Sequence, residues 1–382
     1  MSGNLTFVAT TAMGLEAVAA TELRALGYTD LKVDNGAITF SGGPYDLCRA
    51  NLWLRTADRV RLKVASFHAV TFDELFEKTK ALPWPDILPR DAAFPVIGKS
   101  HGSVLHSVPD CQAIVKKAIV ERMRQTYCCD WFDENGPIFK IQVALQKDVA
   151  TLSIDTSGNG LHMRGYRQLH SAAPLKETLA AAMILLSHWR AEQPFVDPFC
   201  GSGTFPIEAA MIGQHIAPGF NRNFISERWP LCPKALWKQA REEADALADY
   251  AQPLDILGSD IDPRMIELSV HNAAEAGLSE LICFKQMQVA DFTTDKARGC
   301  LIGNPPYGER IGDQEQVEAI CRTLGQLFSR YETWSFYIIS AFEDFEHVFG
   351  RPANKKRKLY NGRIRADYYQ YFGYRQPRHR RE

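Results

Sequence analysis

The second half of the chain alternates apolar runs with amphipathic segments, and this alternation limits the fold more than any other feature of the sequence. Segments that predict strands and segments that predict helices follow one another from residue 175 to residue 371. Strands separated by helices pair in parallel, because the chain must cross back to the same end of the sheet. The pattern predicts a doubly wound, mainly parallel α/β sheet. A hairpin that turns at Asn361-Gly362 adds an antiparallel edge.

The first part of the chain has a different pattern. Short strands and helices alternate there without a glycine-rich phosphate loop, and two β-rich runs meet as a hairpin near Lys147-Asp148. This favours an α+β binding region. A chain of 382 residues also exceeds one ordinary domain. Residues 155–174 are expected to be the hinge, either a solvated linker or a linker that also contacts phosphates through residues such as Arg164 and Arg167.

Composition restricts the class of protein. The net charge is -1, so any affinity for nucleic acid must come from local patches. No apolar run is long enough to span a membrane, and the N-terminus lacks the pattern of a signal peptide. The nine cysteines show no C-x-x-C pair, which favours reduced thiols over disulfides or a zinc site. We therefore expect a cytoplasmic protein without a metal.

Ligands of doubly wound sheets bind beyond the carboxyl ends of the strands, so the strand-end loops are the candidate site. In "DPFCGSGT" the glycines Gly201 and Gly203 permit a tight turn, and the following helix favours an anion at its N-terminus. No Gly-Lys-Ser/Thr follows, and Pro206 stands where a dinucleotide fingerprint has its third glycine. The loop suits a carboxylate better than a pyrophosphate, and we expect close helix–strand contact to be lost. An ordinary glycine-rich turn is the alternative.

Each of these loops begins with a short polar side chain: Asp197, Asp260, Asp291 and Asn304. Asp260 can accept both hydroxyls of a ribose, whereas Asp262, before Pro263, predicts a helix N-cap. Asp291 can accept from an exocyclic amine, and Phe292 can flank a flat ring.

The fourth loop, "GNPPYGER", contains two consecutive prolines and is therefore a rigid corner. The side-chain oxygen of Asn304 and the carbonyl of Pro305 can converge on one N–H₂ group, and Tyr307 can lie against a planar ring. Such a corner suits a planar amine, whose nitrogen lone pair would be free to attack an electrophile above the plane. A plain double-proline turn explains the prolines but not the flanking Asn and Tyr.

These motifs, in this order, resemble the class I methyltransferases that use S-adenosylmethionine on exocyclic amines. With "DTSGNGLHMRGYR", "APLKETLAAA" and "NPPYGERIG", the chain is similar over nearly its whole length to the THUMP-domain RNA guanine-N2 methyltransferases, the RlmL-like group. The resemblance implies a ferredoxin-like region at 1–65, a THUMP RNA-binding domain at 66–164 and a Rossmann-like methyltransferase domain at 165–382. The fuller RlmL form continues into a second methyltransferase, so a single modification is implied here.

The resemblance also implies roles for the loop residues. Asp197, Gly201 and Gly203 would surround the methionine end of the cofactor, Asp260 its ribose, and Asp291 with Phe292 its adenine. Asn304, Pro305 and Tyr307 would hold the target base. The implied substrate is a guanosine in 23S ribosomal RNA, with a tRNA guanosine as the nearest alternative. Adenine N6 in DNA, a glutamine amide in a protein, and a non-catalytic RNA-binding or ribosome-assembly protein remain further alternatives.

RNA contacts are expected from a basic, aromatic-rich C-terminal region, residues 351–382. The alternative is that its aromatic residues are sheet core and its end is a solubilising tail. Arg310 either contacts a phosphate of the target or pairs with Glu309 or Asp313. Smaller basic clusters, such as Arg59, Arg61 and Lys63, occur in the N-terminal region. The candidate RNA contacts are Arg164, Arg167, Arg310, Lys355, Lys356 and Arg357.

Overall fold

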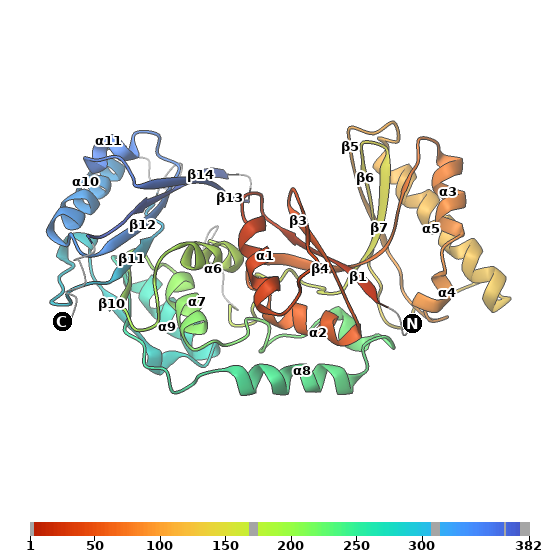
Figure 1. The fold of residues 1–382 in the computed structure, drawn as a ribbon, viewed down its shortest axis with the longest axis horizontal. Coiled ribbons are helices and arrows are strands. Elements are labelled where there is room, and N and C mark those ends of the chain that lie inside the picture. Colours follow the sequence, from red (N-terminus) through yellow and green to blue (C-terminus); the bar gives the residue numbers. More distant parts are fainter. Residues whose placement is uncertain (1–3, 168–174, 307–313, 363, 375–382) are drawn as a thin grey trace, which may run out of the picture. The chain divides into compact units, whose positions relative to one another are not determined.

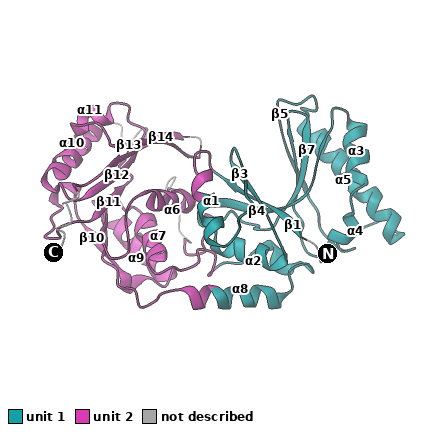
Figure 2. Cartoon of the chain, in the orientation of Figure 1, with its two compact units in different colours: residues 1–11, 19–161, 222–243 teal, residues 12–18, 162–221, 244–382 magenta. Residues whose placement is uncertain are grey.

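The computed structural model describes residues 4–167, 175–306, 314–362 and 364–374, and the chain divides into two compact units (Figure 1). Figure 2 colours the two units separately. Unit 1 comprises residues 1–11, 19–161 and 222–243, and unit 2 comprises residues 12–18, 162–221 and 244–382. Within the described part of the chain, no helix is both long and apolar enough to cross a lipid bilayer.

Unit 1 is built on one seven-stranded sheet with the strand order β2-β3-β1-β4-β7-β6-β5. Along β1 the buried Phe7 and Ala9 alternate with half-exposed Thr6, Val8 and Thr10, so the sheet has an apolar face and a polar face. Its elements are β1 (Leu5–Thr11), α1 (Glu16–Ala25), β2 (Lys32–Asp34), β3 (Ala37–Gly42), α2 (Pro44–Trp53), β4 (Ala57–His68), α3 (Phe72–Lys80), α4 (Trp84–Ile87), β5 (Val96–His101), α5 (Val108–Tyr127), β6 (Ile141–Gln146), β7 (Val149–Asp155), the 3₁₀ helix Ile225–Arg228 and α8 (Lys234–Leu247).

The long strand β4 joins the two halves of this sheet. Its first half pairs antiparallel with β1, and its second half pairs antiparallel with β7. The boundary that the sequence suggested, between residues 65 and 66, therefore falls inside a continuous strand. The predicted hairpin turn at Lys147-Asp148 is confirmed, since both residues have positive φ between β6 and β7.

A segment from the second half of the sequence belongs to unit 1, in contrast to the single C-terminal domain expected from residue 165. The Trp229 ring stacks on Phe139 at a centroid distance of 4.5 Å. The Ser226 hydroxyl donates to the Thr156 carbonyl over 2.7 Å, and Arg49 forms an ion pair with Glu243 at 2.9 Å. These contacts explain why residues 222–243 cluster with the N-terminal sheet.

Unit 2 contains the predicted doubly wound sheet, with the strand order β10-β9-β8-β11-β12-β14-β13. Strands β8 to β12 pair in parallel, and β14 and β13 form the antiparallel edge. Its elements are α6 (Glu177–Leu186), β8 (Phe195–Asp197), α7 (Thr204–Gly213), β9 (Ile256–Asp260), α9 (Pro263–Glu275), the 3₁₀ helix Ser279–Leu281, β10 (Ile282–Gln286), the 3₁₀ helix Val289–Asp291, β11 (Cys300–Gly303), α10 (Gln314–Arg330), β12 (Ser335–Ser340), α11 (Phe345–Phe349), β13 (Lys355–Asn361) and β14 (Ile364–Tyr371).

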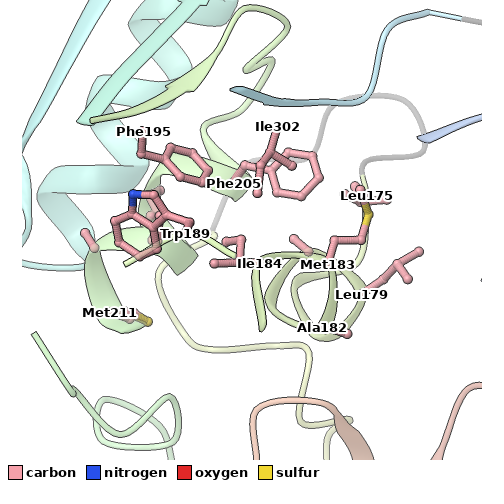
Figure 3. Packing of buried hydrophobic residues seen from close by; sticks show 14 of the residues in the cluster. Leu175, Leu179, Ala182, Met183, Ile184, Trp189, Phe195, Phe205, Met211 and Ile302 are labelled. Carbon is pink, nitrogen blue, oxygen red and sulfur yellow. The ribbon is translucent and has the colours of Figure 1, made fainter. Parts of the chain in front are cut away.

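An apolar core fixes the sheet of unit 2 against its helices (Figure 3). Phe195 from β8 and Ile302 from β11 face Met183 of α6 and Phe205 of α7, and each of these side chains is at least 98% buried. Burial of one such side chain contributes about 1.5–3 kcal/mol. The core therefore holds β8 and β11 side by side, which sets the positions of the loops at their carboxyl ends.

Candidate active site

Three neighbouring strands of unit 2 bring three of the predicted side chains to one edge of the sheet. Strand β8 lies between β9 and β11 and pairs in parallel with both. Asp260 ends β9 and Asp197 ends β8, while Asn304 directly follows β11. The carboxyl ends of neighbouring parallel strands are the usual position of ligands in this architecture.

The glycine-rich loop after β8 is fastened to the end of β9. The Cys200 amide donates to the Ser259 carbonyl over 2.9 Å, and the Gly201 amide donates to Asp260 Oδ2 over 3.0 Å. Gly201 and Gly203 have φ angles of +51° and +84°, a region that glycine enters at little cost. Gly203 is the N-cap of α7, so the loop presents the N-terminus of a buried helix to this edge.

Close packing between α7 and the sheet is retained, although Pro206 replaces the expected glycine. The required glycine is instead on the strand: a Cβ atom at Gly258 would lie 3.1 Å from Pro206 Cγ and 2.7 Å from the Phe284 ring. The expectation that Pro206 would remove this contact was therefore wrong. Close packing needs a glycine on only one of the two elements, and here it is Gly258 of the strand.

Asp260 and Asp262 accept hydrogen bonds from different backbone groups. Asp262 caps α9 by accepting from the Arg264 amide over 2.9 Å, which confirms its N-cap role. Asp260 accepts from the Gly201 amide through Oδ2 and from the Asp262 amide, over 3.0 Å, through Oδ1. A carboxylate can accept about four hydrogen bonds, so a ribose could still bind to the half-buried Asp260.

Asp197 is a buried carboxyl group with unused hydrogen-bonding capacity. It is 1% exposed; Oδ1 accepts from the Phe199 amide over 3.0 Å, and Oδ2 has no partner among the described residues. Burial and the nearby charge of Asp260 raise the pKa of Asp197 well above its ordinary value. A cationic group, such as the α-ammonium of an amino acid, would provide the missing donor. The residues present therefore fit the methionine end of S-adenosylmethionine.

The corner after β11 also holds an acceptor that lacks a donor. Asn304 Oδ1 is buried and has no hydrogen-bond partner within the described ranges, and Pro305 is buried beside it. A Cβ atom at Gly303 would lie 3.0 Å from the Phe199 ring, so glycine permits close packing just before the corner. Tyr307 and Arg310 lie outside the described residues. In the part that is described, no group of three His, Cys, Asp or Glu side chains is arranged to hold a metal ion.

Arg164 and Arg167 do not lie on a surface that RNA could reach. The Arg164 side chain is 1% exposed and pairs with Glu208, which is fully buried, at 3.0 Å. Arg167 is 9% exposed; it pairs with Glu177 at 3.1 Å and donates to the hydroxyl of Thr204 at the start of α7. Their predicted contacts with phosphate are therefore corrected to an internal role, because buried glutamates compensate both charges. Arg167 thus contacts the first residue of α7, directly after the glycine-rich loop.

In the third loop, one of the two predicted residues is exposed and the other is buried. Asp291 is exposed in a short 3₁₀ helix, where it remains available to a ligand. Phe292 is 2% exposed and packs edge-on against Tyr331 and Trp334 at 5.7 and 5.8 Å, so it belongs to the core and not to a ring-binding surface. Ile261 was missed by the sequence analysis. It directly follows Asp260 and is 63% exposed, and an apolar residue after a strand-end aspartate was its only signal.

The basic C-terminal hairpin has a buried aromatic side and an exposed cationic side. Tyr368, Tyr369 and Tyr371 are at most 1% exposed, so these aromatics form sheet core, as the alternative interpretation proposed. Lys355 is exposed on β13, whereas Lys356 approaches Glu346 at 3.3 Å and Asp367 at 3.5 Å. Arg357 on the same strand is half-buried.

Comparison with protein families assigns nearly the whole chain. An RlmL ferredoxin-like domain matches residues 6–61, a THUMP domain matches residues 69–155, and an RMKL-like methyltransferase domain matches residues 164–370. The last match begins at the buried Arg164 and covers the glycine-rich loop and the Asn304 corner.

Individual relatives agree with this assignment. The chain is 55% identical over 378 residues to "Putative RNA methyltransferase YpsC" of Bacillus subtilis (strain 168), and 98% of each protein is covered. A solved structure described as a predicted N6-adenine-specific DNA methylase from Listeria monocytogenes is 56% identical, with a TM-score of 0.94 and 97% of each chain covered. The structure of SMU.472, a putative methyltransferase complexed with SAH, is 49% identical, with a TM-score of 0.94 and coverages of 99% and 100%.

The raised pKa of Asp197 predicts a pH-dependent affinity for S-adenosylhomocysteine (SAH). Protonation removes the charge that holds the ammonium, so calorimetric affinity should fall as pH is lowered from 7.5 to 5.5, with a limiting slope of about tenfold per pH unit. Asp197→Asn should weaken binding at pH 7.5 and flatten this dependence. The control Asp255→Asn lies before the other end of β9 and should change neither. An unchanged pH profile in Asp197→Asn would refute the assignment.

The same group predicts an opposite effect on stability. Because its folded-state pKa is raised, Asp197 stabilises the fold below its unfolded pKa, and this contribution is lost as pH rises through the folded value. Asp197→Asn should therefore raise the Tm of the cofactor-free protein at pH 8, although it weakens SAH binding. A lower Tm would indicate that the ionised carboxylate is a structural requirement.

The internal role of Arg164 predicts a loss of stability on truncation. Arg164→Met leaves Glu208 buried without its partner and should lower the free energy of unfolding by about 3–5 kcal/mol in guanidinium titrations. The double variant Arg164→Met/Glu208→Leu should recover most of this loss. If Arg164→Met were as stable as the wild type but bound RNA more weakly, the original prediction of phosphate contact would be supported instead.

Proposed function

The chain belongs to the RlmL-like family of THUMP methyltransferases, and we propose that it methylates the exocyclic N2 of a guanosine in RNA, with 23S ribosomal RNA as the substrate. The observation that carries methyl transfer to an amine is a pair of buried acceptors at one sheet edge that lack a donor among the described residues: Asp197 Oδ2 on the cofactor side and Asn304 Oδ1 on the substrate side. A buried acceptor without a donor costs about 1–3 kcal/mol, so each is expected to have a ligand partner. The choice of guanosine and of 23S rRNA rests on the resemblance to the RlmL-like group.

The residues that would hold S-adenosylmethionine follow from these contacts. Asp197 would accept from its ammonium, and the amide-lined N-terminus of α7 suits its carboxylate. Asp260 would accept from the ribose hydroxyls. Exposed Ile261 and Asp291 would contact the adenine, one by apolar packing and the other as an acceptor. When bound, the cofactor supplies an electrophilic methyl group on its sulfonium.

The chain's own residues prepare the amine for attack. Asn304 Oδ1 and the Pro305 carbonyl would accept the two in-plane N–H protons, and their rigid corner would keep them in the plane of the base. The lone pair of N2 is then directed out of that plane. The Asn304 amide does not need to ionise, and the amine becomes acidic only as its new bond forms, so no strong base is required.

The target base must leave its helix to reach this corner. Extrusion costs on the order of a few kcal/mol. Stacking on Tyr307 would return about 1–3 kcal/mol. Arg310 and the cations of β13, Lys355, Lys356 and Arg357, are proposed to contact the RNA backbone. Lys356 would exchange its carboxylate neighbours for phosphate, so it is expected to contribute less than Lys355.

The choice of nucleic acid rests on the THUMP match and on the name of the YpsC relative, whereas the Listeria relative's description favours adenine N6 in DNA. Unmodified 23S rRNA, tRNA transcripts and unmethylated DNA should be compared with labelled cofactor, followed by digestion of the product to nucleosides. We expect N2-methylguanosine from 23S rRNA. If only tRNA became labelled, the substrate would be tRNA and not 23S rRNA. If the product were N6-methyladenine in DNA, the proposed reaction would be wrong.

Asn304→Ala tests the corner directly. It removes one acceptor from the reacting amine and should lower kcat by about 10²–10³-fold, by analogy with the removal of one preorganised hydrogen-bonding group at a reacting centre. SAH affinity should change little, since Asn304 is assigned to the substrate. Asn221→Ala, at an exposed position of the same unit, is the control. Methyl transfer at the wild-type rate in Asn304→Ala would remove the proposed role of the corner.

A further inference from the structure

Asn272 is a buried amide on helix α9 that is bonded to the glycine-rich loop. Its side chain is fully buried, and Nδ2 donates to the Ser202 carbonyl over 2.9 Å. Ser202 is itself 4% exposed, so this bond is shielded from water. Among the described residues, Asn272 Oδ1 has no hydrogen-bond partner. The bond to the loop is therefore what this buried polar side chain contributes.

The bonded carbonyl belongs to a tight turn within the loop. The Gly203 amide donates to the Cys200 carbonyl over 2.8 Å and closes the turn from Cys200 to Gly203. The Ser202 carbonyl and the Gly203 N–H belong to one planar trans peptide group, so they point in opposite directions. Asn272 and Cys200 therefore hold the same peptide group from its two sides.

The backbone of Gly203 does not by itself fix the orientation of this peptide group. Its φ angle is +84°, and glycine adopts negative φ values about as readily, so a flip of the peptide group is sterically allowed. In the flipped orientation the Ser202 carbonyl would face the Cys200 carbonyl, and the Gly203 N–H would face the Asn272 N–H₂ group. Both contacts would pair like with like. Asn272 and Cys200 together therefore select the orientation that closes the turn.

This orientation sets up the N-terminus of α7. Gly203 is the N-cap of that helix, and Thr204 and Phe205 follow as its first two residues. Their backbone N–H groups are among those that a helix leaves without an intrahelical partner, whereas the next residue, Pro206, has no N–H. The first turn thus offers two amides to an anion. Both directly follow the peptide group that Asn272 holds.

We propose that Asn272 is a positioning residue for cofactor binding, which holds the Ser202–Gly203 peptide group in the orientation that directs the α7 amides at the carboxylate of S-adenosylmethionine. Asn272 acts through the loop and not by contact with the cofactor. The inference rests on the proposed cofactor site at the glycine-rich loop, and it does not depend on which nucleotide is methylated. It requires that the hydrogen-bond donor at position 272, more than the volume of the side chain, sets the cofactor affinity.

Asn272→Asp tests this role because it keeps the shape of the side chain and makes the donor depend on pH. An ionised carboxylate cannot donate to the Ser202 carbonyl and would accept from a flipped Gly203 N–H, whereas the neutral acid donates again. At pH 7.5, calorimetric SAH affinity should fall about 10–100-fold, because the binding-competent loop is less populated. At pH 5.5, where burial favours the neutral acid, the ratio of wild-type to variant affinity should approach one.

The ratio of affinities separates the new carboxyl group from others that titrate nearby. The titratable side chains that bear on the loop or adjoin Asn272 are Asp197, Asp260, Cys200, His271 and Glu275. They are the same in both proteins, so their contributions cancel in the ratio. Calorimetry also gives the binding stoichiometry, which reports the folded fraction separately from the affinity of the folded protein. A merely structural role would lower the stoichiometry and leave the ratio at one.

Asn51→Asp is the matched control. Asn51 is also a buried helical asparagine, 1% exposed, and its Nδ2 donates to the Leu47 carbonyl over 3.0 Å, but it belongs to unit 1. Its substitution should lower the Tm and leave SAH affinity unchanged at both pH values.

A second variant keeps the test decisive if Asn272→Asp does not fold. Asn272→Ala removes the donor at every pH, so it should weaken SAH binding about tenfold at both pH values without recovery. Wild-type affinity at pH 7.5 in folded Asn272→Asp, or in Asn272→Ala where that variant replaces it, would overturn the proposal. An equal loss at pH 5.5 and pH 7.5 in Asn272→Asp would also overturn it, because the donor would then not be the cause.

Asp197→Asn distinguishes failure of this inference from failure of the proposed cofactor site. If Asp197→Asn and Asn272→Asp both bind SAH as the wild type does, the glycine-rich loop is not the cofactor site and both assignments are wrong. If Asp197→Asn alone weakens binding, the cofactor site stands and Asn272 has only a structural role. The identity of the methylated nucleoside is measured independently of either result.

Discussion

The parallel pairing of β8 with both β9 and β11 is the constraint on which the site depends. β8 has only three residues, and its register aligns Asp197 with Gly258, two residues before Asp260, on one side, and with Ile302, two residues before Asn304, on the other. Its buried Phe195 and Val196 leave no alternative register that keeps both faces apolar. The same buried core therefore orders both parts of the proposed site, the Asp197 and Asp260 side and the Asn304 side.

Unmade hydrogen bonds mark the positions where this protein departs from an optimally stable fold. Asp197 Oδ2, Asn304 Oδ1 and two nitrogens of Arg61 are all buried without a partner in the ranges described. Arg164 is also buried, but Glu208 accepts hydrogen bonds from its guanidinium group, so its role is structural. Arg167 Nε also lacks a partner in the ranges described, although other nitrogens of Arg167 pair with Glu177 and Thr204. An unmade hydrogen bond on a cation therefore does not by itself identify a ligand site.

Much of the architecture follows from local patterns in the sequence. Alternating strands and helices, strand-end aspartates and turn residues predicted the sheet of unit 2, the cap at Asp262 and both hairpins, because these features depend on neighbouring residues. The pairing of Arg164 with Glu208 could not be predicted, since it joins residues 44 apart through the packing of α7. The same reason applies to Phe292, because helix α10 separates it in sequence from its partners Tyr331 and Trp334. It also applies to the attachment of residues 222–243 to unit 1.

Selection of the target nucleotide cannot depend on the Asn304 corner alone. Two acceptors in one plane hold any planar N–H₂ group, so guanine N2 and adenine N6 satisfy them equally, and relatives of nearly equal identity carry descriptions that name different substrates. Discrimination must therefore come from groups that contact the rest of the base and the backbone around it. Phosphate contacts position a nucleic acid without reading its sequence. Phosphate contacts would decide which RNA region is presented, and the pocket would then decide which base of that region reacts.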